Sequence, residues 1–158
     1  MFGQGGSPGE IAIDYAVLDW KDSYEEAINS PKMAGKKWRF GKDFWTNLDT
    51  SFDVEIGGVA VPAGYYYLTL EKRTGDAGDQ YMLALHDAAT IRKMKLDAFM
   101  ADRMKDVGIE VPMQHKTGEP SKQLEIALTM EQGSQDTGAL NVRFGPHVLT
   151  APLKLKLK

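Results

Sequence analysis

The sequence predicts a mainly β protein, an antiparallel β-sandwich or a jelly-roll-like barrel with one or two helical insertions. Most of the chain alternates apolar and polar side chains with period two, which is typical of strands that face water on one side. Glycine- and proline-containing turns separate these alternating segments. The resulting set of eight or so short strands favours a sandwich or barrel over other architectures.

The length and composition indicate one domain. A chain of 158 residues with 42% hydrophobic content can bury most of the surface that it exposes when unfolded, so one core is expected. The first eight residues are rich in glycine. We therefore expect a flexible segment over residues 1–8 and a single β-sandwich domain over residues 9–158.

The segment from 51 to 61 predicts a β-hairpin. Its apolar side chains alternate on both sides of Gly57-Gly58. A two-residue type I′ turn at these glycines pairs Ile56 with Val59 and Val54 with Val61, which places all four side chains on one face. The segment 62–64, Pro-Ala-Gly, then reverses the chain before an aromatic strand.

Four later segments also alternate, over residues 80–86, 123–130, 140–144 and 149–157. In the last of these, leucines alternate with lysines and with Pro152. Proline cannot donate a ladder hydrogen bond, so Pro152 predicts an edge strand or a bulge. The lysines of LKLKLK are then expected to protect an edge against pairing with other chains.

Two segments predict helices instead. Ser23 and Glu26 have the spacing of a capping box, which predicts a short helix from about Tyr24 to Asn29. The second helix is expected over Ala88 to Asp106, with Gly108 as its stop. Its apolar stripe, which we expect to pack against the sandwich, contains Leu96, Phe99, Met100 and Met104.

The charge and composition argue against several classes of protein. The formal net charge is −3, with acids and bases interspersed, so we expect no nucleic-acid partner. The apolar runs are too short for a transmembrane segment. The sequence has no cysteine, which removes thiolate nucleophiles and cysteine-based zinc sites.

The motifs with catalytic or metal-binding spacing are weak. The segment Gly5–Gly9 matches G-x-S-x-G, but no strand precedes it and proline follows the serine, so we interpret it as a chance match. His86, His115 and His147 lack metal-ligand spacing and are expected to be surface or hydrogen-bonded residues. We therefore expect no metal and no cofactor.

An aromatic and charged segment gives the candidate ligand-binding residues. Trp38 and Trp45 flank Arg39 and Asp43, and consecutive tyrosines follow the hairpin. Because neighbouring side chains of a strand point to opposite faces, Tyr66 is exposed if Tyr65 and Tyr67 enter the core. Exposed aromatic rings beside charges can stack on a sugar or a peptide, whereas the alternative is that both tryptophans fill the core. The candidate set is Trp38, Arg39, Asp43, Trp45 and Tyr66.

Arg39 has two interpretations. We expect it to be mostly buried and paired with a carboxylate, with Asp43 or Asp53 favoured. The alternative is that Arg39 anchors an anion in a ligand cleft.

The block from 36 to 71 resembles the signature of a bacterial family, the domain of unknown function 2911, whose pattern reads roughly W-R-x-G-A-N, D-V-x-I-x-G and P-A-G-x-Y-x-L. The family's G-A-N stands here as Gly41-Lys42-Asp43, and the segment from about Ile91 to Lys116 is longer than the usual connection. Weaker likeness at both ends extends the resemblance over most of the chain. The matching positions are Trp38, Arg39, Gly41, Thr46, Asp53, Val54, Ile56, Gly58, Pro62, Ala63, Gly64, Tyr65, Tyr67 and Leu68.

Taken together, these observations favour an exported, non-catalytic module that binds a carbohydrate, a peptide or a cell-envelope partner. Members of the resembled family are commonly exported, so a periplasmic or extracellular location is expected, with the cytoplasm as the alternative. Two other functions stay open. One is a hydrolase or isomerase whose site combines Arg39, Asp43 and His147, and the other is a purely structural protein.

Overall fold

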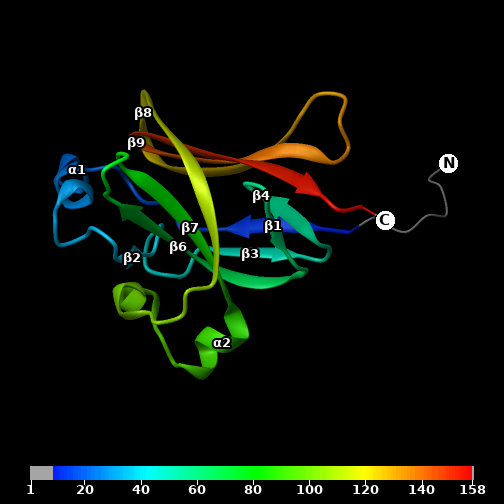
Figure 1. Cartoon of the computed structure of the whole chain (residues 1–158), viewed down its shortest axis with the longest axis horizontal. Helices are drawn as coiled ribbons and strands as arrows, with labels where there is room; N and C mark the ends of the chain where they lie inside the picture. Colours follow the sequence, from blue (N-terminus) through cyan, green and yellow to red (C-terminus); the bar gives the residue numbers. More distant parts are fainter. Residues whose placement is uncertain (1–8, 158) are drawn as a thin grey trace.

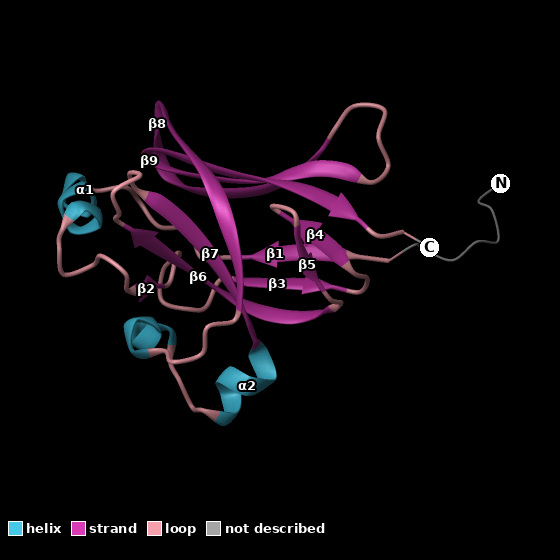
Figure 2. Cartoon of the chain, in the orientation of Figure 1, coloured by secondary structure: helices cyan, strands magenta, loops and turns pink. Residues whose placement is uncertain are grey.

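The computed structural model describes residues 9–157, in which nine strands form one antiparallel sheet that folds into two layers (Figures 1 and 2). The strand order is β1-β3-β6-β7-β8-β9-β4-β5, and β2 pairs with β6 outside this path. The mainly β, sandwich-like fold predicted from the sequence is confirmed. The segment 1–8, with most of the G-x-S-x-G match, lies outside the described residues.

One long strand, β8 (Ile109–Met130), belongs to both layers. Its first part, 109–113, pairs with β7, and the part from 114 onward pairs with β9. The first layer also contains β1 (Ile11–Asp14), β2 (Lys37–Trp38), β3 (Asn47–Thr50), β6 (Gly64–Arg73) and β7 (Gln80–Asp87). The second layer also contains β4 (Val54–Ile56), β5 (Val59–Val61) and β9 (Thr137–Leu155).

The hydrophobic core lies between the two layers. Inward side chains of both layers are removed from water, as expected for the facing sides of a sandwich. The largest fully buried side chains of this core are Leu48, Ile56, Leu68, Leu83, Leu85, Leu140 and Leu153.

The hairpin β4–β5 has the predicted register. Val54 pairs with Val61, and Ile56 pairs with Val59. The backbone φ angles of Gly57 and Gly58 are 60° and 78°, as a type I′ turn requires.

The predicted edge position of the C-terminal strand applies only to residues 153–155, which pair with β4 alone. Strand β9 lies inside the sheet, between β8 and β4. Its pairing with β8 ends at Thr150, and its pairing with β4 begins at Leu153. Pro152 lies between these two segments, at the point where β9 changes partner, so its missing N–H interrupts neither ladder.

The first helix, α1 (Asp22–Asn29), ends before Pro31 as predicted but starts earlier than expected. Its N-cap position is Lys21, and no side chain of the described residues caps it. The capping box of Ser23 and Glu26 is therefore wrong, because Ser23 is the second residue of the helix and not its N-cap.

The predicted long helix over 88–106 is two short helices, α2 (Ala88–Lys93) and the 3₁₀ helix η1 (Ala98–Arg103). The break contains Lys95, whose φ of 55° is left-handed. The expected packing of Phe99 is wrong, because its side chain is 67% exposed, whereas Ile91 is fully buried. No helix in the described part of the chain is long and apolar enough to cross a membrane.

Replacing either turn glycine by alanine is expected to destabilise the protein. Gly58→Ala should cost about 1 kcal/mol, because a left-handed backbone disfavours a Cβ atom. Gly57→Ala should cost more, since its Cβ would lie 2.8 Å from Cγ1 of Val111. Chemical denaturation measures both losses. Gly75→Ala is the control, since the φ of Gly75 is not positive and a Cβ there would lie 4.0 Å from the carbonyl oxygen of Gly78, an ordinary contact. Equal stability of all three variants would contradict the turn.

Ile91→Ala and Phe99→Ala test the revised arrangement of the 88–106 segment. Ile91→Ala should lower the free energy of unfolding by about 2–5 kcal/mol, because it leaves a cavity under α2. Phe99→Ala should lower it by only about 0.5 kcal/mol, as is usual for exposed side chains. The reverse ranking in urea denaturation would show that the segment packs through Phe99.

Candidate functional site

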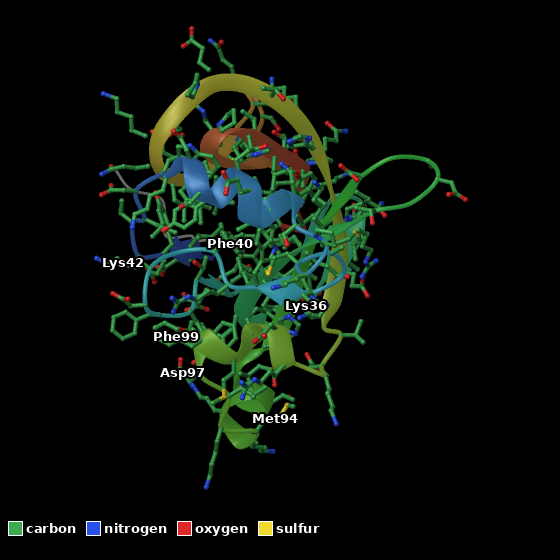
Figure 3. The ribbon with its side chains drawn as sticks, turned by 90° about the vertical axis from the view of Figure 1, so that its left-hand side faces the viewer. Lys36, Phe40, Lys42, Met94, Asp97 and Phe99 are labelled. Atoms are coloured by element: carbon green, nitrogen blue, oxygen red, sulfur yellow. The ribbon has the colours of Figure 1, made fainter. Side chains whose placement is uncertain are left out.

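An apolar cavity of about 210 Å³ lies at the end of the sandwich that α1 covers. Both layers, α1 and the segment after β2 contribute to its wall. Figure 3 looks onto this end of the molecule, with α1 above the segment of Lys36, Phe40 and Lys42, and with α2 and η1 below. The lining residues are Leu18, Tyr24, Ala27, Ile28, Trp38, Arg39, Phe40, Gly41, Leu70, Tyr81, Leu124, Val142, Phe144, His147 and Leu149.

Two aromatic residues of the cavity wall, Tyr24 and Phe144, contact Trp20, which is not itself a lining residue. The ring of Trp20 contacts Phe144 edge-on, with centroids 4.9 Å apart, and Tyr24 with centroids 6.0 Å apart. Trp20 can approach this closely because residue 145 is glycine: a Cβ there would lie 2.4 Å from the indole ring. This glycine has a φ of 57°, so the backbone conformation also favours it.

A chain of hydrogen bonds runs from α1 across the cavity wall to β8. Nε2 of His147 lies 2.6 Å from Oε2 of Glu25, and Nδ1 of His147 lies 2.9 Å from Nε2 of His115. An ionised carboxylate only accepts hydrogen bonds. With both rings neutral, Nε2–H of His147 therefore donates to Glu25, and Nε2–H of His115 donates to Nδ1 of His147.

A second polar link joins α1 to the first layer. The Lys72 Nζ donates to Oδ1 of Asn29 over 2.7 Å and lies 3.3 Å from Oδ2 of Asp79. Nδ2 of Asn29 in turn donates to Oε1 of Glu25 over 3.0 Å. The helix that covers the cavity is thus tied to β6 through Lys72 and to β9 through His147.

The surroundings shift the pKa values of this network. Burial raises the pKa of Glu25, but the hydrogen bonds from His147 and Asn29 outweigh burial and hold it below its usual value. Burial, followed by the neighbouring His147 and Lys72, lowers the pKa of His115. Burial also raises the pKa of Tyr81, whose ring packs on His115, to about 12. At neutral pH the network therefore contains an ionised Glu25 and a neutral His115, with His147 between them.

The structure brings two of the five candidate residues to the cavity. Trp38 lines it, and the indole Nε1 is buried without a hydrogen-bond partner within residues 9–157. Arg39 also lines it, with Nη1 donating to the carbonyl oxygen of Asp43 over 2.8 Å and the guanidinium carbon 3.8 Å from the centroid of Phe99. Asp43 is exposed and lies outside the cavity wall.

The predicted pairing of Arg39 with a carboxylate is wrong. Arg39 is half-buried, and among the described residues no carboxylate lies within 4.0 Å of its guanidinium. Asp43 contacts it through the backbone carbonyl only, while Asp53 accepts a hydrogen bond from the amide of Ala63.

The other two candidates lie elsewhere. Trp45 stacks on Tyr67 with ring centroids 5.2 Å apart, beside Tyr65 and Arg92. Tyr66 is buried, and its hydroxyl donates to the carbonyl of Pro62 over 2.7 Å. The expectation that Tyr66 is exposed is wrong, because the alternating strand places Tyr66 inward and both neighbouring tyrosines outward.

His86 lies between a carboxylate and a hydroxyl group, as the histidine of a catalytic triad does, but it is fully buried. Its Nδ1 lies 2.7 Å from Oδ2 of Asp106, and its Nε2 lies 2.9 Å from Oγ1 of Thr69. Burial lowers the pKa of His86 despite the carboxylate. Thr69 and His86 are both 0% exposed, and a nucleophile needs access to substrate. This arrangement therefore holds the 104–108 segment against the sheet.

Sequence reasoning missed Glu25 and the pairing of His115 with His147. The two histidines are brought together by the register of β8 and β9, in which Thr117 pairs with His147. Within the described residues, no group of three or more His, Cys, Asp or Glu side chains is placed to hold a metal ion.

Comparisons with protein-family models, with curated proteins and with solved structures gave no match. The fold and the site therefore define this chain only as a mainly β, two-layered protein with an apolar end cavity. The resemblance to the domain of unknown function 2911 stays a prediction.

Lowering the pH from about 7.5 to about 5.5 is expected to reduce the free energy of unfolding. Burial lowers the pKa of both His86 and His115 in the folded chain. The unfolded chain therefore binds protons more readily, and stability present above pH ~6.5 is lost as the pH falls toward the folded pKa values. Urea denaturation at both pH values measures the loss.

His115→Gln removes one of the two histidines whose pKa is lowered in the folded chain. It should make the free energy of unfolding depend less steeply on pH. Gln114→Ala, an exposed neighbour, is the control and should keep the wild-type dependence. Stability that does not change across this pH range would contradict the neutral, buried state of His86.

Proposed function

We propose that the protein is a non-catalytic module that binds a small, mainly apolar molecule in the cavity under α1. The observation that supports this proposal most directly is the cavity itself, whose wall is built from aliphatic and aromatic side chains of both layers. Small-molecule sites are typically concave and apolar, with a few placed polar groups.

The cavity volume limits the size of the ligand. An apolar cavity of ~150 Å³ holds a benzene molecule. Scaling to the about 210 Å³ found here gives room for about eight non-hydrogen atoms. The wall offers few hydrogen-bonding groups for a sugar, so an apolar ligand fits better than the carbohydrate considered from the sequence. A peptide fits only if it inserts one apolar side chain.

The enzymatic alternative has less support. Arg39 and His147 both line the cavity, but Asp43 lies outside its wall. Both ring nitrogens of His147 have protein partners, whereas a general base needs a free lone pair within reach of substrate. The geometry therefore favours a binding role for this wall.

A periplasmic or extracellular location belongs to the same proposal. Its support is the resemblance of the 36–71 block to an exported family. Fractionation of cells that make the natural protein tests it, and recovery of the protein with cytoplasmic markers would contradict it.

Filling the cavity is expected to abolish binding. Val142 is 3% exposed and lines the cavity, so Val142→Phe would place a ring in the space that a ligand takes. In methyl NMR spectra, toluene and octanol should shift the signals of Leu70, Leu124 and Leu149 in the wild type and leave those of Val142→Phe unchanged.

Val107→Phe makes the same change at a position that is 56% exposed and outside the cavity, and it should bind as the wild type does. The melting temperature of each variant shows whether it is folded. If neither probe shifts the cavity methyl signals of the wild type, the cavity does not bind small apolar molecules and the proposal is wrong.

A further inference from the structure

The cavity wall contains one cation whose hydrogen-bonding capacity is largely unused. A guanidinium carries five N–H donors, and Arg39 uses one of them, from Nη1 to the carbonyl of Asp43. In the described part of the chain, Nε and Nη2 of Arg39 have no hydrogen-bond partner. These two atoms form one edge of the guanidinium, the edge that binds a carboxylate through two parallel hydrogen bonds.

Two contacts hold this edge in place. The carbonyl of Asp43 accepts from Nη1, and the guanidinium lies over the ring of Phe99. Phe99 is 67% exposed, so its position is explained by this cation–π contact and not by core packing. Asp43 presents its carbonyl from a left-handed backbone with a φ of 66°. A guanidinium held in this way loses little freedom when it binds an anion.

The charges around Arg39 favour an anion. Lys36 and Lys42 belong to the same segment, are exposed, and have no ion-pair partner within residues 9–157. In Figure 3 they lie on either side of Phe40, which lines the cavity. Lys37 is the exception, because it lies 3.2 Å from Glu71. Cations at the rim raise the local concentration of an anionic ligand.

The other polar groups of the wall are less suited to this role. Both ring nitrogens of His147 are engaged by Glu25 and His115. Trp38 lines the cavity with an indole N–H that has no hydrogen-bond partner among the described residues. This N–H can donate to an acceptor atom of a ligand, but it carries no charge.

We infer that the ligand is an organic carboxylate, with its apolar body in the cavity and its carboxylate on the free edge of Arg39. This inference rests on the proposed function, since it names the chemical class of the molecule that the cavity binds. The size of the cavity points to an apolar body of about eight non-hydrogen atoms, so octanoate is a suitable probe.

The test compares the binding of three linear eight-carbon probes that differ in their head group: octanoate, octylammonium and octanol. Titration calorimetry of the wild type should show that octanoate binds at least about tenfold more tightly than octylammonium, because a guanidinium attracts one and repels the other. Added salt should weaken octanoate binding and leave octanol binding nearly unchanged.

Arg39→Met keeps an apolar side chain of similar length and removes the charge. It should weaken octanoate binding about tenfold or more and change octanol binding less than about twofold, since a charge-assisted hydrogen bond is lost only by the carboxylate. Lys154→Met is the control: it removes the same charge from an exposed position of β9 outside the cavity wall, and should change octanoate binding less than about twofold.

The outcomes separate this inference from the proposed function. If octanol binds and octanoate does not, or if Arg39→Met weakens the binding of both probes equally, the inference of a carboxylate ligand is wrong. Arg39 is then only a wall residue, while the proposal of an apolar binding site remains. If no probe binds the wild type, the proposed function itself is wrong. If Arg39→Met does not fold, the comparison of octanoate with octylammonium on the wild type decides the inference.

Discussion

The architecture depends on one strand that pairs in both layers. Strand β8 leaves β7 after Met113 and continues with β9 from Gln114, so the two layers are halves of one sheet. Its pairing with β9 is irregular between Thr117 and Glu125, and such irregularities bend a strand. The same stretch and its partner contribute Leu124, Phe144 and His147 to the cavity wall. The irregular part of the β8–β9 pairing and the cavity wall therefore occupy the same end of the sandwich.

The helix α1 covers this space mainly through side-chain contacts. Ile28 is its buried apolar residue, and Tyr24 contacts the aromatic wall. Its two polar links, from Glu25 to His147 and from Asn29 to Lys72, reach opposite layers. A helix of eight residues has little stability by itself. Its position over the cavity therefore depends on the packing of Ile28 and Tyr24 together with these two links.

The hairpin turn could be predicted from the sequence, whereas the cavity could be predicted only in part, through Trp38 and Arg39. The hairpin at Gly57-Gly58 has the expected register because two glycines and four flanking residues determine it. The alternating pattern predicts the strand that contains Tyr66, but it does not predict which of its faces points into the core. The helical spacing around Phe99 does not predict the left-handed backbone of Lys95, which ends the helix early. The cavity combines residues from both ends of the chain, so its composition depends on pairings that no local pattern contains.

The two histidine networks differ in burial and therefore in what a change of charge can do. His86 lies between Thr69 and Asp106, fully removed from solvent, so its protonation can only weaken the fold. His147 lies between Glu25 and His115 on the wall of the cavity. A proton added to this hydrogen-bonded network changes the charge on the cavity wall and alters the hydrogen bond between His147 and Glu25, which helps to hold α1. Because the same carboxylate belongs to α1 and accepts from His147, the electrostatics of the cavity and the position of its covering helix are physically coupled.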